Sequence, residues 1–281
     1  MKAPRVNGHG VGLGRIAIED ASISLGHGDD ASEAVAGLDI SVAPGEFVCI
    51  LGPSGCGKST LLGALAGHVA NSGGSLTVDG QAITGPSPDR GIVFQQHTLF
   101  PWKKVRENVC FGPKMRGIGK VVRRQLADEL LALVGLSGFE EFYPSQLSGG
   151  MQQRVEIARV LINQPRVLLM DEPFSALDAQ TRSMMHELLL DIWTERPTTL
   201  IFVTHDIEEA LFLADRVIVM SRRPGRIVED LRVPFSRPRP ADIVTEIEFA
   251  RLKRRLLLLL RPDQQSTTLH EYQSEHALAP N

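Results

Sequence analysis

Apolar and polar residues alternate along much of the first hundred positions, which is the period expected of β-strands. The string RIAIEDASISL (15–25) alternates in this way, and AVAGLDISVAPGEFVCIL (34–51) is typical of two strands joined by a Pro-Gly turn. The string GSLTVDGQAIT (74–84) predicts a hairpin around Asp79 and Gly80, because Asp-Gly favours a tight turn between strands.

The spacing of apolar residues changes after the next strand, GIVFQQ (91–96). From Val105 to Phe142 the apolar residues recur at helical intervals, as in RRQLADELLALVGL, and helical spacing resumes in MQQRVEIARVLI (151–162). The strings RVLLMDEP (166–173) and TTLIFVTHD (198–206) are instead short and almost wholly apolar, as expected of parallel strands covered on both faces. A sheet core with a helical insertion is therefore predicted.

The order of these elements predicts an α/β fold. The helical insertion spans about 96–161, and a helix at about 207–214 and the strand RVIVMS follow later. We divide the chain into a main domain over residues 1–232, which contains the insertion, and a terminal segment over 233–281. That segment begins with the proline-rich linker VPFSRPRP and continues into a helical tail rich in leucine and arginine.

Composition narrows the class of protein. The chain has 281 residues, of which 43% are hydrophobic, and this is ample for a sizeable core. Its formal net charge of -3 gives no basic balance, so nucleic acid is not expected as a partner. No apolar run approaches the about 18 to 20 residues that cross a bilayer, and the first residues lack an apolar signal core. The three cysteines form no C-x-x-C pair, which suits a reducing cytosol.

The string FVCILGPSGCGKSTLLGAL (47–65) places a glycine-rich loop between an apolar strand and a helix. It contains the pattern G-x-x-x-x-G-K-[ST], which predicts a phosphate-binding loop. Glycines let backbone N–H groups converge on an anion, and the helix adds the positive end of its dipole. Lys58 supplies a charge for the β- and γ-phosphates, and the Ser59 hydroxyl can bind Mg²⁺. The predicted nucleotide contacts are Gly52, Pro53, Ser54, Gly55, Cys56, Gly57, Lys58, Ser59 and Thr60.

Two adjacent carboxylates, Asp171 and Glu172, follow the apolar strand VLLM, at the end of a strand where open α/β sheets bind ligands. One can hold magnesium through its water shell, and the other points to the opposite side and can take a proton from water. Adjacent carboxylates are costly unless a cation lies nearby, which favours this role over a surface acidic turn. Glu172 beside a metal also favours hydrolysis over the phosphate transfer of a small-molecule kinase.

The string QLSGGMQQRVEIARV contains a second candidate anion site. Ser148 occupies an N-cap position, Gly149 and Gly150 expose the backbone, and an amphipathic helix follows. This helix terminus has neither a lysine nor metal ligands of its own. By itself, SGG before a helix is typical of a flexible cap. Its place 90 residues after Lys58 and just before the carboxylate strand favours a role in nucleotide binding.

In this order, GPSGCGKST, LSGGMQQR, VLLMDEP, SALD and VTHD resemble the ATP-binding subunit of an ATP-binding cassette (ABC) transporter, over about Ile16 to Ile227. The resemblance implies a P-loop NTPase (RecA-like) core with an antiparallel β subdomain and a helical insertion subdomain. It also implies ATP and Mg²⁺ as cofactors and a head-to-tail homodimer, with each ATP between the phosphate loop of one copy and the LSGG segment of the other. The alternative is a soluble ABC-class ATPase acting on nucleic acid or the ribosome. Such proteins usually carry two cassettes, long coiled-coil insertions or basic arms, and this chain has a single set of motifs.

The resemblance further implies residue roles. Glu172 would be the general base, His205 in VTHD would contact the γ-phosphate, and Gln95 would meet the metal and the attacking water. Asp178 in SALD would link the two sites across the dimer. The implied metal ligands are Ser59, Gln95 and Asp171. The implied contacts to the nucleotide held by the other copy are Ser148, Gly149 and Gly150.

Two positions near the nucleotide raise further questions. The family usually places an aromatic residue in the first strand region to stack on adenine, whereas the matching position here is near Leu25 in ASISLGHG, without Tyr, Phe or Trp. We expect weaker discrimination between ATP and GTP as a result. Cys56 lies in the loop at a helix N-terminus, an environment that lowers a thiol pKa. It is either a reactive thiol or a small residue that fills the turn.

The string TLFPWKKVRENV follows Gln95 and carries Phe100, Pro101 and Trp102 at the rim of the helical insertion. These residues form either an ordinary core edge or a groove that accepts a short helix from a membrane permease. The dipeptide PW and the string THDIEEALFLADRVIVMSRRPGRIV are similar to importers of nitrate, sulfonates and taurine. The similarity predicts a peripheral subunit on the cytoplasmic face of the inner membrane, with an extracytoplasmic solute-binding protein as an indirect partner.

The tail EFARLKRRLLLLLR places leucines beside arginines. Such a helix packs on its own domain, attaches to a membrane surface, or makes a regulatory contact. The sequence leaves these three alternatives open.

Overall fold

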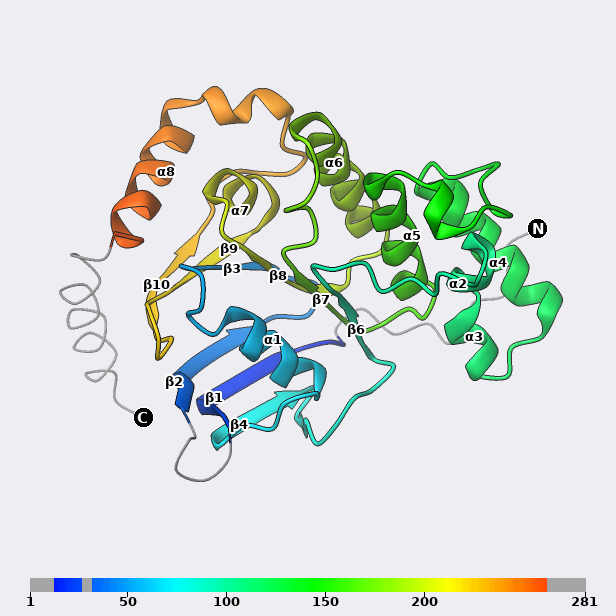
Figure 1. The fold of residues 1–281 in the computed structure, drawn as a ribbon. Helices are drawn as coiled ribbons and strands as arrows, with labels where there is room; N and C mark the ends of the chain where they lie inside the picture. Colours follow the sequence, from blue (N-terminus) through cyan, green and yellow to red (C-terminus); the bar gives the residue numbers. More distant parts are fainter. Residues whose placement is uncertain (1–12, 27–31, 262–281) are drawn as a thin grey trace.

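Two sheets organise the residues that the computed structural model describes, which are 13–26 and 32–261 (Figure 1). The smaller sheet is antiparallel, with strand order β2-β1-β4-β5. Its strands are β1 (Ile16–Leu25), β2 (Ser32–Val42), β4 (Gly73–Val78) and β5 (Gln81–Ala82). The predicted hairpin around Asp79 and Gly80 is confirmed, because these two residues join β4 to β5 and both have positive φ.

The larger sheet has the strand order β10-β9-β3-β8-β7-β6 and is parallel except for β10. Its strands are β3 (Phe47–Leu51), β6 (Arg90–Val93), β7 (Val167–Asp171), β8 (Thr199–Thr204), β9 (Arg216–Met220) and β10 (Ile227–Arg232). The two strings predicted as parallel strands, β7 and β8, are neighbours in register, with Asp171 opposite Val203. The carboxyl ends of β3, β7 and β8 therefore meet at one edge of the sheet.

The helices are α1 (Lys58–Ala66), α2 (Val105–Val109), α3 (Phe111–Met115), α4 (Lys120–Leu133), α5 (Gly149–Leu161), α6 (Ala179–Glu195), α7 (Ile207–Leu213) and α8 (Ile247–Leu259). The helical stretch predicted between Val105 and Phe142 is divided into three pieces, because the chain turns between α2 and α3 and again through Gly117 to Gly119. Gly135 follows the end of α4 with φ of 71°, a conformation that ends helices.

Alternating residues of the larger sheet face two different cores. In β3, Phe47, Cys49 and Leu51 pack with residues of α6, α7 and α8, whereas Val48 and Ile50 pack with α1 and the smaller sheet. Figure 1 shows α1 between the two sheets, where it covers one face of each. Because every residue of β3 is buried, the strand that leads into the phosphate loop is fixed from both sides.

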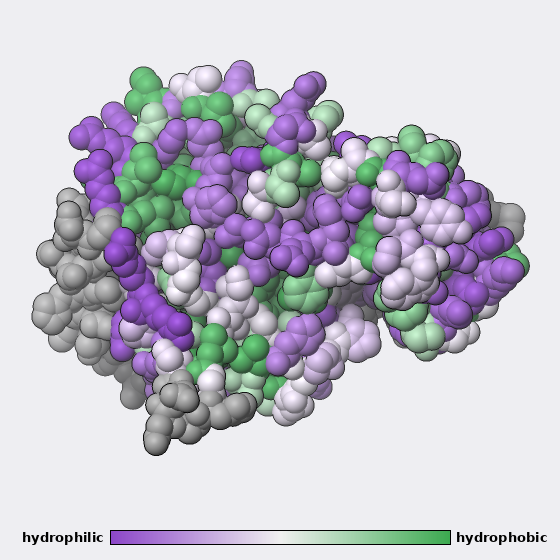
Figure 2. Space-filling model, viewed as in Figure 1, coloured by the Kyte–Doolittle hydropathy of each residue, from purple (hydrophilic) through white to green (hydrophobic). Residues whose placement is uncertain are grey.

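The helices α2 to α5 have their own core, which includes residues such as Val105, Leu131 and Val155. In Figure 1 they form a lobe beside the two sheets, and this lobe is called the helical subdomain below. Figure 2 shows that its visible surface mixes hydrophilic and apolar residues.

The described part of the C-terminal segment packs on the main core. Phe249, Leu252, Leu256 and Leu259 on one face of α8 are buried in the cluster that contains α7 residues. Arg239 reaches the end of α7 and donates to the carbonyl oxygens of Leu211, Phe212 and Ala214 at 2.8 to 3.1 Å. Burial lowers the pKa of Arg239 to about 10. Of the three alternatives for the tail, the structure shows a helix packed on its own domain up to residue 261; residues 262–281 lie outside the described part.

Candidate active site

The phosphate loop connects the buried strand β3 to helix α1. Gly57 caps α1 with φ of 98°, and a Cβ at this position would lie 2.6 Å from the carbonyl oxygen of Ala34. Glycine is therefore required here both for the left-handed backbone and for the close approach of β2. Gly55 also has positive φ, and a Cβ there would meet nothing within 4 Å, so this part of the loop faces open space.

Lys58 begins α1 and is almost fully buried beneath the loop. Its Nζ donates to the carbonyl oxygens of Gly52 at 2.7 Å and Pro53 at 3.0 Å. These carbonyls fix the ammonium group under the loop, where it can also donate to phosphate oxygens because it has three N–H groups. The loop thus has the left-handed glycines and the buried lysine of a phosphate-binding loop, and the contact of its residues with phosphate stays a prediction.

The strand β7 brings Asp171 beside the start of α1. The Ser59 hydroxyl donates to Asp171 Oδ1 at 3.0 Å, although the two residues are 112 positions apart. Burial raises the pKa of Asp171, the neighbouring Glu172 raises it further, and the hydrogen bond from Ser59 opposes both effects. Hydroxyl and carboxylate oxygens are the donors that Mg²⁺ prefers, so the pair fits such an ion.

Glu172, the residue after Asp171, contacts His205 instead of Ser59. Glu172 has φ of 43°, its N–H donates to the carbonyl oxygen of Val203, and its Oε2 lies 3.0 Å from Nδ1 of His205. His205 comes directly after β8 and is exposed. A residue other than glycine at positive φ is strained, and such strain is common at functional positions. Glu172 and His205 are therefore placed as a hydrogen-bonded pair at the same sheet edge as Asp171.

Gln95 and the LSGG segment are separate from this group. Gln95 is exposed two residues after β6, and within the described residues it makes no hydrogen bond to Ser59 or Asp171. Ser148 caps α5 by accepting a hydrogen bond from Met151 N–H at 3.3 Å. Gly150 packs on the first turn of α6, where a Cβ would lie 2.6 Å from Thr181 Cγ2.

Asp178 caps α6 beside the LSGG segment. It accepts hydrogen bonds from the backbone N–H of Thr181 at 3.0 Å and from the Thr181 hydroxyl at 2.7 Å. These bonds lower the pKa of the Asp178 carboxyl. Asp178 and Ser148 thus lie at neighbouring helix starts, since Gly150 contacts Thr181.

The expectation that the pKa of Cys56 is lowered is wrong. The thiol is buried, with 1% of the residue exposed, and burial raises its pKa more than Lys58 lowers it. The side chain belongs to the buried cluster that contains residues of α1 and of both sheets, so the structure favours the small residue that fills the turn. Leu25, at the end of β1, is exposed, and residues 27–31 beside it lie outside the described part. The ATP-versus-GTP expectation stays a prediction.

A parallel sheet with a phosphate loop after one strand and two carboxylates after another defines a P-loop NTPase. The chain matches the ABC transporter family over residues 35–175. It is 51% identical to a taurine import ATP-binding protein of Roseobacter denitrificans, over 74% of this chain and 77% of that protein. It is 52% identical to a nitrate import ATP-binding protein of a Synechocystis species, over 71% and 75% of the two chains.

A similar solved structure is a dimeric ATP-binding cassette in a post-hydrolysis state with ADP and Pi, with a TM-score of 0.69 and 31% identity over 79% of this chain and 100% of that one. An uncharacterised ABC transporter ATP-binding protein of Methanocaldococcus jannaschii is 48% identical over 82% of this chain and 85% of that protein. The chain therefore belongs to the ABC transporter family, as an ATP-binding and ATP-hydrolysing subunit. The predicted fold class is confirmed by these neighbours.

Proposed function

We propose that two copies of this chain close head to tail around ATP and that hydrolysis drives solute import through a membrane permease. The observation that carries the proposal is that one chain supplies two separate parts of a site. The phosphate loop, the Ser59–Asp171 pair and the Glu172–His205 pair gather at one sheet edge. The LSGG helix terminus, by contrast, packs on α6. A second copy would bring its own terminus to the open side of the nucleotide.

The residues present fit ATP and Mg²⁺. Ser59 and Asp171, whose oxygens lie 3.0 Å apart, would hold the ion, with Gln95 as a further ligand. When bound, Mg²⁺ supplies positive charge that neutralises the phosphate oxygens. Lys58 binds the β- and γ-phosphates, and Glu172 accepts a proton from the attacking water. His205 contacts the γ-phosphate, and its ring lies 3.0 Å from the Glu172 carboxylate through Nδ1.

Replacing Ser148 with arginine tests the shared site. The variant should bind ATP as a single chain with unchanged affinity, because the phosphate loop is intact. It should fail to pair with a second copy, and its ATPase activity should fall by at least about 100-fold, the scale of losing one set of transition-state donors. Gln125→Ala on exposed α4 is a control with the parental rate. A Ser148→Arg chain that hydrolyses ATP normally would refute the shared site.

For the solute, we propose a small anion of the sulfonate or nitrate type. Support comes from the names of the relatives, which are taurine and nitrate import subunits, and these favour transport over the nucleic-acid alternative. Uptake of labelled taurine and nitrate by cells that carry the parental chain or Lys58→Ala tests this directly. Loss of one uptake activity in the variant is expected, whereas equal uptake of both solutes in the two strains would contradict it.

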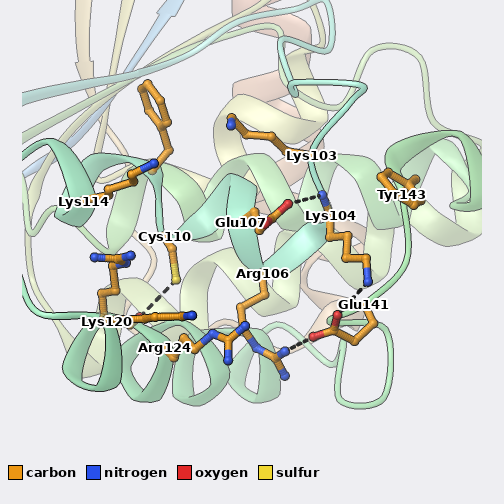
Figure 3. Close-up of a pocket in the computed structure, with 12 residues that line it drawn as sticks. Lys103, Lys104, Arg106, Glu107, Cys110, Lys114, Lys120, Arg124, Glu141 and Tyr143 are labelled. Carbon is orange, nitrogen blue, oxygen red and sulfur yellow. Dashed lines mark hydrogen bonds and ion pairs between the residues drawn. The ribbon is translucent and has the colours of Figure 1, made fainter.

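The permease would dock on the helical subdomain beside Trp102, and the subunit would then sit peripherally on the cytoplasmic face of the inner membrane. Trp102 is 70% exposed. Close to it, a pocket of about 340 Å³ is lined by twelve residues, seven of them lysine or arginine (Figure 3). Two carboxylates also line it. Glu141 is bound by Lys104 Nζ at 2.9 Å and by Arg106, and Glu107 accepts a hydrogen bond from the Lys104 N–H at 3.1 Å. Within the described residues, no helix is long and apolar enough to span a bilayer.

This pocket favours a permease segment that carries carboxylates. Lys120 and Arg124 project from α4 into the pocket (Figure 3), and neither has an ion-pair partner among the described residues. Their reversal in a Lys120→Glu, Arg124→Glu chain should reduce co-purification with the permease and leave the ATPase of the isolated subunit unchanged. Arg254→Glu on the exposed side of α8 is the matched control. Undiminished co-purification of the double variant would place the permease elsewhere.

A further inference from the structure

A carboxylate is buried inside the helical subdomain, on the helix that begins with the LSGG segment. Glu156 of α5 is 1% exposed. Its Oε1 accepts hydrogen bonds from the Thr98 N–H and from the Thr98 hydroxyl, the latter at 3.2 Å. A buried carboxylate is costly unless such donors compensate for the lost water. The loop around Thr98 therefore supplies what Glu156 requires.

Arg159, one turn further along α5, holds the same loop residue. Its Nη1 donates to the Thr98 carbonyl oxygen at 2.8 Å, and its Nη2 donates to the Thr98 hydroxyl. The guanidinium also lies over the Phe100 ring, 5.8 Å from its centroid. The backbone N–H, the carbonyl and the hydroxyl of Thr98 are thus all bound by α5. We call this set of contacts, formed by Thr98, Glu156 and Arg159, the clasp.

The clasp joins two segments that the proposed function places at two different nucleotides. Thr98 lies three residues after Gln95, in the connection that leaves β6. Glu156 lies eight residues after Ser148, which is about 12 Å along a helix that rises 1.5 Å per residue. The helix is unbroken from Gly149 to Leu161, so it is a rigid element through which a displacement at one end can reach the other. The Gln95 loop and the Ser148 helix terminus are therefore tied together through α5.

The two oxygens of the Glu156 carboxylate differ in their hydrogen bonds. Oε1 accepts the two bonds from Thr98. Glu156 Oε2 has no hydrogen-bond partner among the described residues, and His97 Nδ1 lies 3.7 Å from it. The Arg159 guanidinium lies near the other oxygen, with Nη2 at 3.9 Å from Oε1. The carboxylate thus has hydrogen-bond donors at Oε1, which faces Thr98, and none at Oε2 among the described residues. The same loop is also bound by α2, because Asn108 accepts a hydrogen bond from the Phe100 N–H at 2.8 Å. The loop is therefore held by α5 at Thr98 and by α2 at Phe100.

We propose that Glu156 is a positioning residue that couples the Gln95 loop to the Ser148 helix terminus, so that a nucleotide bound at one site sets the position of the terminus that reaches the other. The inference rests on the proposed function, because it assumes that Gln95 and Ser148 serve two nucleotides. It gives a role to Glu156, which stands in the string QLSGGMQQRVEIARV but was assigned no function by the sequence. Glu156 touches neither nucleotide, and its effect passes through Thr98 and α5.

The test compares Glu156→Ala with Glu156→Gln. Alanine removes the Oε1 atom that accepts both hydrogen bonds from Thr98, whereas the glutamine amide oxygen can accept the same two bonds. For Glu156→Ala we expect ATP affinity of the single chain within twofold of the parent, a kcat about 10-fold lower and a Hill coefficient for ATP that falls toward 1, the scale of a typical coupling between sites. Glu156→Gln should recover at least half of the kcat. Glu129→Ala, on the exposed face of α4, is the carboxylate control.

A second variant keeps the proposal testable if Glu156→Ala fails to fold. Thr98→Val retains the N–H and the volume but loses the hydroxyl, and it should show a smaller loss of kcat and of the Hill coefficient with unchanged ATP affinity. A parental kcat and Hill coefficient in both Glu156→Ala and Thr98→Val would overturn the proposal, as would a Glu156→Gln chain as impaired as Glu156→Ala. Normal ATPase activity of Ser148→Arg would instead refute the shared site itself, so the two failures are distinguishable.

Discussion

Two adjacent leucines of α8 test whether the C-terminal helix is part of the main core. Leu256 is 0% exposed and packs with α7 in the large core cluster, whereas Leu257 is 47% exposed. Leu256→Ala should therefore lower the free energy of unfolding by about 2 to 5 kcal/mol, as core leucine truncations do. Leu257→Ala should change it by less than about 0.5 kcal/mol. Both substitutions have the same intrinsic helix propensity change, so their difference isolates burial.

The assay is thermal unfolding of each variant in parallel. For a chain of this size, 1 kcal/mol corresponds to a shift in Tm of about 2 to 4 °C, so Leu256→Ala should lower Tm by about 4 to 20 °C and Leu257→Ala by less than about 2 °C. ATPase activity at 25 °C should persist in both, since neither residue lies at the candidate active site. Equal Tm values for the two variants would refute the view that α8 is packed as part of the domain.

Three further predictions concern the phosphate loop. Lys58→Ala should abolish ATP binding measured by equilibrium titration, and retained affinity would contradict the phosphate-binding role of the loop. Gly57→Ala should lower Tm and weaken ATP binding at least about 10-fold, because its Cβ would meet Ala34 at 2.6 Å in a left-handed backbone that costs about 1 to 2 kcal/mol; Gly119→Ala, with open space around it, should do neither. Because burial raises the pKa of Cys56, alkylation of the folded chain should be slow at pH 7 and accelerate as pH rises above the ordinary thiol range. Rapid labelling at neutral pH that ATP prevents would contradict this.

The phosphate loop and the pair of carboxylates could be predicted from the sequence because each is formed by consecutive residues. The loop from Gly52 to Thr60 fixes its own geometry through glycines, and Asp171 and Glu172 follow an apolar strand whose neighbours are also apolar strands. Parallel packing then brings their ends together, as the Ser59–Asp171 contact shows. The hairpin around Asp79 was predictable for the same local reason.

Other features depend on contacts between distant residues and have no signature in the string. Glu156 reads as an ordinary polar residue on an amphipathic helix, and only the fold brings Thr98 to it across 58 positions. Arg239 reads as part of a proline-rich linker, yet it caps α7 from inside the core. The pKa of Cys56 could not be predicted correctly, because its helix terminus is visible in the sequence whereas its burial in the core between the two sheets is not.

The central claim is that ATP joins two copies of this chain, and the Glu172→Gln variant tests it most directly. This variant should bind Mg-ATP normally and fail to hydrolyse it, since the carboxamide cannot take the proton from water. Sedimentation velocity of Glu172→Gln with saturating Mg-ATP should therefore show a dimer, and the same chain carrying Ser148→Arg should stay a monomer. A Glu172→Gln chain that remains monomeric with ATP bound, at concentrations well above those needed for binding, would contradict the account.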